Sequence, residues 1–247
     1  MSLPPVVSEA EWLEARQALL AEEKELTRRR DALNTRRREL PMVKVDKDYA
    51  FTGPSGPVTL VDLFDGRPQL IVQHFMFDPS WEDGCPSCTA GLDEMCDGLI
   101  DHLNVRGTSF AVVARAPIDK IEDYKKRRGW DVPFVSSFDS DFNYDFHVTL
   151  DESRAPIMYN YRTKDEFLAL GETWVNDGVS YEMPGKSCFL RVGDDVFHTY
   201  SAYARGLEAT GGSYYFLDWT VLGRQEDWEE PKGRADIVRG AEPNFAS

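Results

Sequence analysis

The central part of the chain alternates between apolar runs of strand length and longer, more polar stretches. Apolar runs occur at residues 67–77, 108–115 and 132–138, and we interpret them as buried strands. The stretch from the cysteine-rich segment to about Leu103 and the stretch over residues 117–130 have the character of helices. Apolar strands separated by crossover helices are typical of a parallel sheet that is covered on both faces. The pattern therefore predicts an α/β fold.

A seven-residue repeat of single apolar positions precedes this region. It predicts one helix over residues 8–40, which Pro41 ends. Ser8 and Glu11 match the capping box that starts many helices. The positions that follow each apolar residue by three and four are mainly charged, so the apolar stripe is thinner than a coiled-coil seam. We expect it to dock on the main domain or on a second subunit, as in a homodimer. The stripe consists of Trp12, Leu19, Leu26, Leu33 and Leu40.

The last third of the chain combines a hairpin signal with less regular segments. Residues 186–203 form two alternating segments around Gly193-Asp194, which is the pattern of a β-hairpin. Residues 211–224 predict a final helix. The expected organisation is a helical arm over 1–41, a main domain over 42–224 with an insertion at about 139–184 before the hairpin, and a tail over 225–247.

Composition and charge exclude several classes of protein. The 247 residues carry 43 acidic and 28 basic side chains, for a net charge of −15, which argues against a general nucleic-acid-binding surface. No apolar run approaches the roughly 20 residues that cross a bilayer. The start of the chain lacks the basic and apolar regions of a secretory signal. We therefore expect a cytoplasmic protein without nucleic-acid or membrane partners, in which cysteines serve chemistry more often than structural disulfides.

The clearest candidate site is the segment FDPSWEDGCPSCTAGLDEMC, residues 77–96, which holds three of the four cysteines. A C-x-x-C motif that follows a strand and opens a helix is the sequence form of a thioredoxin-like redox site. Cys85 lies at the expected helix start, where unpaired N–H groups and the helix dipole stabilise a thiolate. Pro86 suits the first turn of the helix. Cys88, one turn later, is placed to resolve a mixed disulfide formed at Cys85.

Zinc binding is the main alternative for this spacing. A structural zinc site needs four ligands, usually from a second C-x-x-C or a histidine pair. Cys96 and Cys188 are isolated in the sequence, and the four histidines are scattered. We therefore predict no metal and interpret Cys96 and Cys188 as small buried residues.

Four stretches of the chain resemble the DUF899 family. They are HFMFDPSWEDGCPSC, VVARAPIDKIEDYKKRRGW, VPFVSSFDSDFNYDFHV and FHTYSAYARG with the later YYFLDWTVLGR, and together they extend from about residue 10 to 230. The resemblance implies a thioredoxin-like fold in the peroxiredoxin-type (AhpC/TSA) arrangement. It also implies a dithiol–disulfide oxidoreductase without a metal or organic cofactor, acting on a disulfide or peroxide substrate and recharged by a dithiol reductant. The alternatives are a thiol peroxidase that works through a Cys85–Cys88 disulfide and a non-enzymatic binding or scaffold module.

The chain departs from the related patterns at two places. The peroxidatic motif would have Pro at position 78 and Ser or Thr at 82, where this chain has Asp78 and Glu82. Thioredoxins place a cis-proline directly before the strand of the hairpin, where we expect Lys186 or Ser187, with Pro184 too early. The first departure argues against a one-cysteine peroxidase, and the second argues against general reduction of protein disulfides.

Three further residues are candidates for substrate binding or for stabilising the thiolate. Arg115 ends the 108–115 strand, and sites in open parallel sheets form beyond the carboxyl ends of the strands. A cation there would favour the Cys85 thiolate; the competing interpretation is a surface ion pair with an acid such as Glu82 or Asp83. The other two candidates are Trp81 and Ser187.

Overall fold

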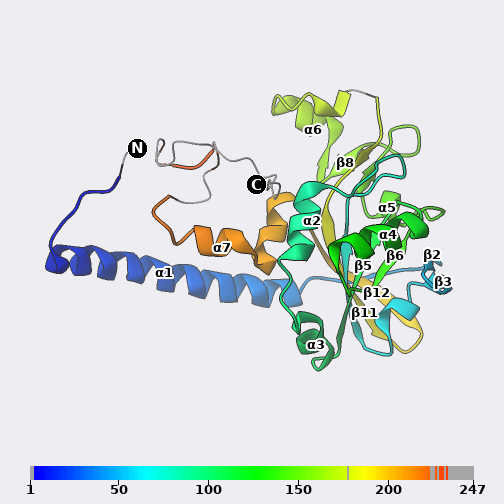
Figure 1. Ribbon diagram of the computed structural model, residues 1–247, viewed down its shortest axis with the longest axis horizontal. Coiled ribbons are helices and arrows are strands. Elements are labelled where there is room, and N and C mark those ends of the chain that lie inside the picture. Colours follow the sequence, from blue (N-terminus) through cyan, green and yellow to red (C-terminus); the bar gives the residue numbers. More distant parts are fainter. Residues whose placement is uncertain (1–2, 177, 223–225, 227, 231, 233–247) are drawn as a thin grey trace. The chain divides into compact units, whose positions relative to one another are not determined.

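The computed structural model describes residues 3–176, 178–222, 226, 228–230 and 232, and the helices and strands are labelled in Figure 1. The chain divides into two compact units. One holds the described residues up to Pro41 together with those from Tyr214 onward, and the other holds the described residues of Met42–Ser213.

The first unit contains the long helix α1 (Glu9–Arg38), which confirms the predicted helix and its capping box. The Ser8 hydroxyl accepts a hydrogen bond from the Glu11 backbone N–H at 3.3 Å, and the Glu11 carboxylate accepts one from the Ser8 N–H at 2.9 Å. The helix ends at Arg38, earlier than Pro41, and none of its residues is buried. No helix among the described residues is long and apolar enough to cross a membrane.

The predicted final helix is much shorter than expected. Helix α7 spans Ser213–Leu217, and the chain then continues in turns as far as residue 222. Residues 223 and 224, and most of the predicted tail over 225–247, lie outside the described residues.

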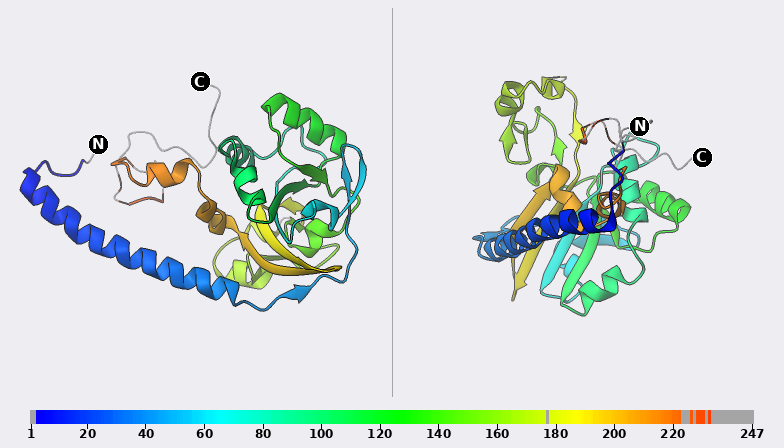
Figure 2. Two further views of the ribbon diagram at one scale, coloured as in Figure 1. Left: turned by 90° about the horizontal axis from the view of Figure 1, so that it is seen from below. Right: turned by 90° about the vertical axis from the view of Figure 1, so that its left-hand side faces the viewer.

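An eight-stranded mixed sheet organises the second unit. Its order is β1-β12-β11-β4-β5-β6-β2-β3. Strands β4, β5 and β6 are parallel, while β11 runs antiparallel to β4 on the other side. The hairpin β11–β12 forms the long yellow-to-orange pair in the left panel of Figure 2. The strands are β1 (Val43–Lys44), β2 (Ala50–Gly53), β3 (Gly56–Thr59), β4 (Gln69–His74), β5 (Thr108–Ala114), β6 (Phe134–Ser136), β11 (Gly185–Val192) and β12 (Asp195–Tyr203).

Helices cover both faces of this sheet. One face packs against α2 (Pro86–Asp93), α3 (Leu99–Asn104) and α4 (Ile118–Arg128), in an apolar cluster that includes Cys88. The other packs against α5 (Phe142–Asp145) and the 3₁₀ helix η1 (Asp62–Phe64). A helix that carries the C-x-x-C motif follows a central strand, which has a parallel neighbour on one side and an antiparallel hairpin on the other; this arrangement defines a thioredoxin-like fold. The predicted fold class is confirmed.

The helix expected from the cysteines to Leu103 is split in two. Helix α2 ends at Asp93 and α3 begins at Leu99, with Gly98 between them at φ 83°. Only glycine adopts this left-handed conformation without strain, so the glycine allows the chain to turn between the helices. The break leaves Cys96 outside both helices and exposed, so the prediction of a buried Cys96 is wrong.

The irregular region before the hairpin folds over a small core of its own. That cluster includes Val148, Ile157, Phe167 and Val175. Two short sheets, β7–β10 and β8–β9, and helix α6 surround it. These elements are β7 (Thr149–Leu150), β8 (Met158–Tyr159), β9 (Arg162–Thr163), α6 (Lys164–Ala169), the 3₁₀ helix η2 (Trp174–Asn176) and β10 (Tyr181–Glu182); a last 3₁₀ helix, η3 (Ala204–Thr210), follows β12.

Candidate redox site

The two cysteines of the C-x-x-C motif lie at the start of α2, beside the end of β4. Cys85 is the N-cap residue of α2, and Pro86 is the first helical residue. The Cys85 backbone N–H donates a hydrogen bond to the Met76 carbonyl at 2.9 Å, which fixes the loop against the strand end. Cys85 therefore lies where the free N–H groups of the first turn favour negative charge.

Gly84 is required by close packing directly before the pair. A Cβ atom at this position would lie 2.4 Å from a ring carbon of Phe75 and 3.1 Å from one of Tyr124. Both aromatic side chains are buried in the cluster that holds Cys88. The missing side chain thus lets the loop press onto the aromatic core and brings the cysteines to the sheet.

The two thiols differ in exposure and in ease of ionisation. Cys85 is partly exposed, whereas Cys88 is buried, and both side chains are thiols rather than disulfides. A hydrogen bond with Cys85 raises the pKa of Cys88 well above its ordinary value, and burial adds to the shift. Because an interaction that raises the pKa of a thiol stabilises its protonated form, this hydrogen bond favours a proton on Cys88. Negative charge on Cys85 is favoured by its position at the start of α2.

Two further residues, Lys186 and Tyr159, lie near enough to Cys88 to interact with it electrostatically. Neither residue was predicted from the sequence as a neighbour of the cysteine pair. The charge of Lys186 lowers the pKa of Cys88, against the larger upward effects. Burial lowers the pKa of Lys186, whose Nζ donates a hydrogen bond to Thr210 Oγ1 at 2.7 Å. Burial raises the pKa of Tyr159 to about 12, with a small further contribution from Cys88. Lys186 lies in the sequence PGKS, and its nearness to Cys88 follows only from the pairing of β11 with β4.

Pro184 lies closer to the first strand of the hairpin than was predicted from the sequence. Strand β11 begins at Gly185, so Pro184 directly precedes it. Gly185 pairs with His74 at the end of β4, which places this turn beside the strand that leads to the cysteines. The expectation that Pro184 comes too early was wrong because the strand starts before Lys186.

Trp81 lies in the loop between β4 and α2. It is partly buried and packs against the same apolar cluster as Cys85 and Cys88. Lys120 Nζ holds this loop from α4 through hydrogen bonds to the carbonyls of Pro79, at 3.0 Å, and Trp81, at 2.5 Å. Trp81 is therefore in the vicinity of the pair and remains a candidate for substrate contact.

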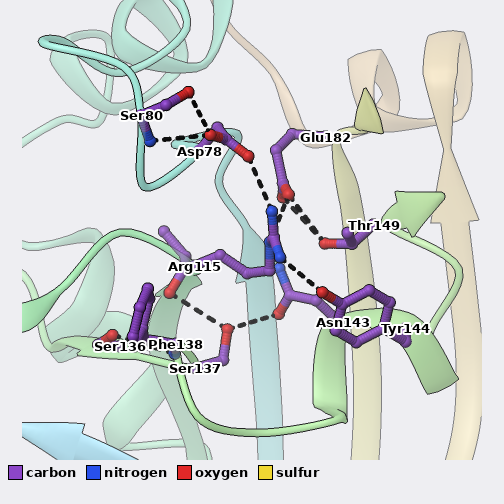
Figure 3. Close-up of polar contacts among 11 residues, drawn as sticks. Asp78, Ser80, Arg115, Ser136, Ser137, Phe138, Asn143, Tyr144, Thr149 and Glu182 are labelled. Carbon is purple, nitrogen blue, oxygen red and sulfur yellow. Dashed lines mark hydrogen bonds and ion pairs between the residues drawn. The ribbon is translucent and has the colours of Figure 1, made fainter. Parts of the chain in front are cut away.

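Arg115 is held by three other side chains (Figure 3). Its guanidinium donates hydrogen bonds to Glu182 at 2.6 Å, to the Tyr144 hydroxyl at 2.6 Å and to Asp78 at 2.8 Å. Thr149 donates to both carboxylate oxygens of Glu182, at 3.0 and 3.1 Å. Arg115 thus pairs with the buried Glu182 of β10 and the partly buried Asp78 of the loop, rather than with Glu82, Asp83 or a cysteine. It ties the loop before Cys85 to α5 and β10.

Ser187 lies away from the cysteines. Successive side chains in a strand point to opposite faces, so Ser187 faces away from Lys186 and Cys188. It is fully buried and hydrogen-bonded to His74 Nε2 and Ser201 Oγ, both at 2.8 Å. The structure therefore does not bring Ser187 to Cys85 and Cys88.

Cys188 is the remaining cysteine, and a metal ion is the remaining alternative for the cysteine-rich segment. Cys188 is partly buried, and burial raises its pKa while the nearby Lys186 opposes the shift. Within the part of the chain that the structure describes, no group of three His, Cys, Asp or Glu residues is arranged to hold a metal ion.

Comparison with known proteins gives one match that covers most of the chain. A family model described as "Bacterial protein of unknown function (DUF899)" matches residues 1–240. No curated protein matches the chain significantly. Solved structures include peroxiredoxin Q of Xanthomonas campestris, with TM-score 0.45 and 14% identity over 65% of this chain and 83% of that chain. Peroxidoxin BcpB of Mycobacterium tuberculosis gives TM-score 0.44 and 13% identity over 69% and 92%. At these values the likeness is too weak to assign a role to any residue.

Proposed function

The chain belongs to the DUF899 family, and on that premise we propose that it is a thiol–disulfide oxidoreductase with Cys85 as the attacking and Cys88 as the resolving cysteine. The observation that carries the proposal is the asymmetric thiol pair at the start of α2. Cys85 is partly exposed and lies at the start of α2, while Cys88 is buried and its pKa is raised by the hydrogen bond with Cys85 and by burial. A reactive and a protected thiol within one helical turn suit the two steps of disulfide exchange.

The reaction proceeds through a mixed disulfide. The Cys85 thiolate attacks one sulfur of a substrate disulfide, and the other sulfur leaves as a thiolate that takes up a proton. Cys88 then loses its proton and attacks the Cys85 sulfur, which forms the Cys85–Cys88 disulfide and releases the second substrate thiol. The substrate gains two electrons and two protons. A dithiol reductant restores the pair by the reverse exchange and is itself oxidised to a disulfide.

Lys186 serves the second step in this mechanism. Cys88 must ionise although burial and the Cys85 hydrogen bond hold its pKa high. Forming the mixed disulfide removes the Cys85 thiolate as a neighbour, and the charge of Lys186 then favours the Cys88 thiolate. We place the reaction in the cytoplasm, where a reducing environment keeps cysteines outside disulfides, as all four are here.

Trapping the mixed disulfide tests the proposal. The protein should carry Cys96→Ser and Cys188→Ser as a background, because Cys96 is exposed and would react on its own. Adding Cys88→Ser should accumulate a mixed disulfide at Cys85 with a small disulfide reporter. Adding Cys85→Ser instead should abolish fast reaction with the reporter. A mixed disulfide at Cys88 would overturn the assignment, and two unreactive thiols would favour the binding or scaffold module.

Peroxide as the oxidant distinguishes the thiol peroxidase alternative. In that reaction the Cys85 thiolate would attack the O–O bond and become a sulfenic acid, and Cys88 would then condense with it and release water. In the same background, faster oxidation by hydrogen peroxide than by the disulfide reporter would favour the peroxidase.

A further inference from the structure

A cavity of about 350 Å³ opens on the sheet face opposite the cysteine pair. Two of its lining residues, Tyr49 and Phe146, belong to the core cluster of that face, whereas Cys88 belongs to the cluster of the other. The rest of the wall comes from the segment that begins with β1, from the end of α5 and the residues after it, from β12 and from the β8–β9 hairpin. The volume falls within the roughly 300–1,000 Å³ of typical small-molecule pockets.

His147, which lines the cavity, has the left-handed backbone conformation that is strained for a histidine and unstrained for glycine. Helix α5 ends just before it, and His147 has φ 54°. The His147 N–H donates to the Tyr144 carbonyl at 3.1 Å, and the Val148 N–H donates to the Asn143 carbonyl at 2.9 Å. This is the hydrogen-bond pattern of a helix end at which glycine is the usual residue. The chain therefore keeps an imidazole in the cavity wall at the expense of backbone strain.

The β8–β9 hairpin shows the same feature. Its two-residue turn consists of Asn160 and Tyr161, with φ 48° and 63°. Such turns strongly prefer glycine at the second position, where this chain has a tyrosine. The Tyr161 hydroxyl donates to the Ser201 carbonyl at 2.9 Å, and its ring lies 5.6 Å from that of Tyr203, another lining residue. A second strained residue thus contributes its side chain to the same cavity.

A second histidine of the wall is fixed by a chain of hydrogen bonds. His198 Nε2 lies 2.7 Å from Ser201 Oγ, which lies 2.8 Å from Ser187 Oγ. Ser187 Oγ in turn lies 2.8 Å from Nε2 of the fully buried His74. By contrast, the His147 ring and the Asn160 amide make no hydrogen bond within the described part of the chain. The cavity thus has one fixed wall and two polar groups that are free to bond a ligand.

Both lysines that line the cavity are paired with acids. Lys47 pairs with Asp141 at 2.7 Å and with Asp145 at 2.8 Å. Lys44 pairs with Asp195 at 2.8 Å. Burial lowers the pKa of His147 and of His198, so both imidazoles are neutral at pH 7. Neither the cations nor the histidines of the wall offer an unpaired charge to a ligand.

We propose that this cavity binds a small uncharged aromatic molecule that carries a hydroxyl or carbonyl group. The ring packs against the aromatic wall formed by Phe146 and Tyr203, and His147 and Asn160 bond the polar group. An anionic ligand is disfavoured because the lining cations already have carboxylate partners. The site is independent of the proposed redox chemistry, since none of its residues contacts the cysteine pair and its test measures binding alone.

The test uses 2-naphthol as the probe and naphthalene-2-carboxylate as its charged counterpart, with binding followed by NMR titration of the full chain. Wild-type protein should bind 2-naphthol saturably at one site and bind the carboxylate more weakly. His147→Gly should weaken binding at least about fivefold, the effect of one lost neutral hydrogen bond. Its melting temperature should stay the same or rise, because glycine relieves the backbone strain.

Two further variants separate the roles of His147. His147→Asn tolerates the left-handed conformation and keeps a hydrogen-bonding group, so it should retain part of the affinity. His102→Ala removes an exposed imidazole of α3, outside the cavity, and should leave binding unchanged. The proposal is overturned if 2-naphthol does not bind saturably, if His147→Gly binds it as wild type does, or if the carboxylate binds more tightly. A lower melting temperature for His147→Gly would likewise show that the imidazole serves the fold rather than a ligand.

Discussion

Replacing Arg115 with methionine removes the cation from a buried ionic cluster. The Glu182 side chain is only 2% exposed and that of Arg115 14% exposed, and their closest atoms are 2.6 Å apart. Breaking a buried pair from one side typically destabilises a protein by about 3–5 kcal/mol, because the remaining charge is left in a poorly solvating environment. The Asp78 arm is 21% exposed and contributes less. We expect Arg115→Met to lower the free energy of unfolding by about 3–5 kcal/mol at pH 7.

The pH dependence of this loss provides a second signature. Burial already raises the pKa of Glu182, although Arg115 and Thr149 oppose the shift. Without Arg115 the folded-state pKa should rise further, so that the folded protein binds a proton more readily than the unfolded chain does. Stability from a raised carboxyl pKa is present below the unfolded value and lost as the pH rises through the folded value. The deficit of the variant relative to wild type should therefore shrink as the pH falls toward the range in which Glu182 is protonated in the variant.

Urea unfolding followed by circular dichroism measures this difference. The matched control is Arg127→Met, which breaks the exposed ion pair with Asp83, whose side chains are 56% and 60% exposed. The control should change stability by less than about 1 kcal/mol. A loss below about 1 kcal/mol for Arg115→Met as well would refute the view that Arg115 ties the loop to the insertion. A displaced pH midpoint for alkylation of Cys85, with stability unchanged, would instead support direct stabilisation of the thiolate.

Three other perturbations test separate features. Gly84→Ala places a methyl group 2.4 Å from Phe75 and should destabilise the protein by about 1–3 kcal/mol in urea unfolding. The control Gly91→Ala, whose methyl group would meet nothing within 4 Å, should stabilise α2 by about 0.5–1 kcal/mol. Equal effects of the two substitutions would contradict the close packing at Gly84. Burial lowers the pKa of His74 from 6.5 to about 3, so the folded protein resists protonation of His74 and loses stability as the pH falls below 6.5. His74→Gln should flatten the pH dependence of the unfolding free energy between about pH 7 and 4. The same pH dependence in the variant and the wild type would exclude His74 as its source. Deleting residues 1–40 should change the oligomeric state or the solubility if the exposed stripe of α1 has a partner subunit, and an unchanged mass by light scattering with unchanged stability would remove the homodimer hypothesis.

Sequence patterns with local causes predicted their elements well. The capping box of Ser8, the apolar strands and the hairpin around Gly193-Asp194 each depend on residues that are close together in the chain, and the structure contains all three features. The break at Gly98 was missed because an isolated glycine is also tolerated within a helix.

Contacts between residues far apart in the sequence were the part of the site that the sequence could not predict. Lys186 approaches Cys88 only because β11 lies beside β4, and the sequence separation of these strands hides that contact. The partners of Arg115 come from a loop and from the insertion, whose folding over its own core has no simple periodic signal. Ser187 was a candidate because we expected Lys186 or Ser187 at the position of the thioredoxin cis-proline, yet strand alternation places Ser187 on the face opposite Lys186.

Mass spectrometry of the thiols tests the central claim most directly. Trypsin leaves Cys85, Cys88 and Cys96 in one peptide, because no Lys or Arg lies between residues 68 and 105; cleavage at Asp93 and Glu94 separates Cys96 from the pair. After mild oxidation with a small disulfide, the account predicts that the peptide carrying Cys85 and Cys88 loses two hydrogens and that a dithiol reductant restores them. A pair that stays reduced, or a disulfide that joins Cys85 to Cys96 or Cys188 instead, would contradict it.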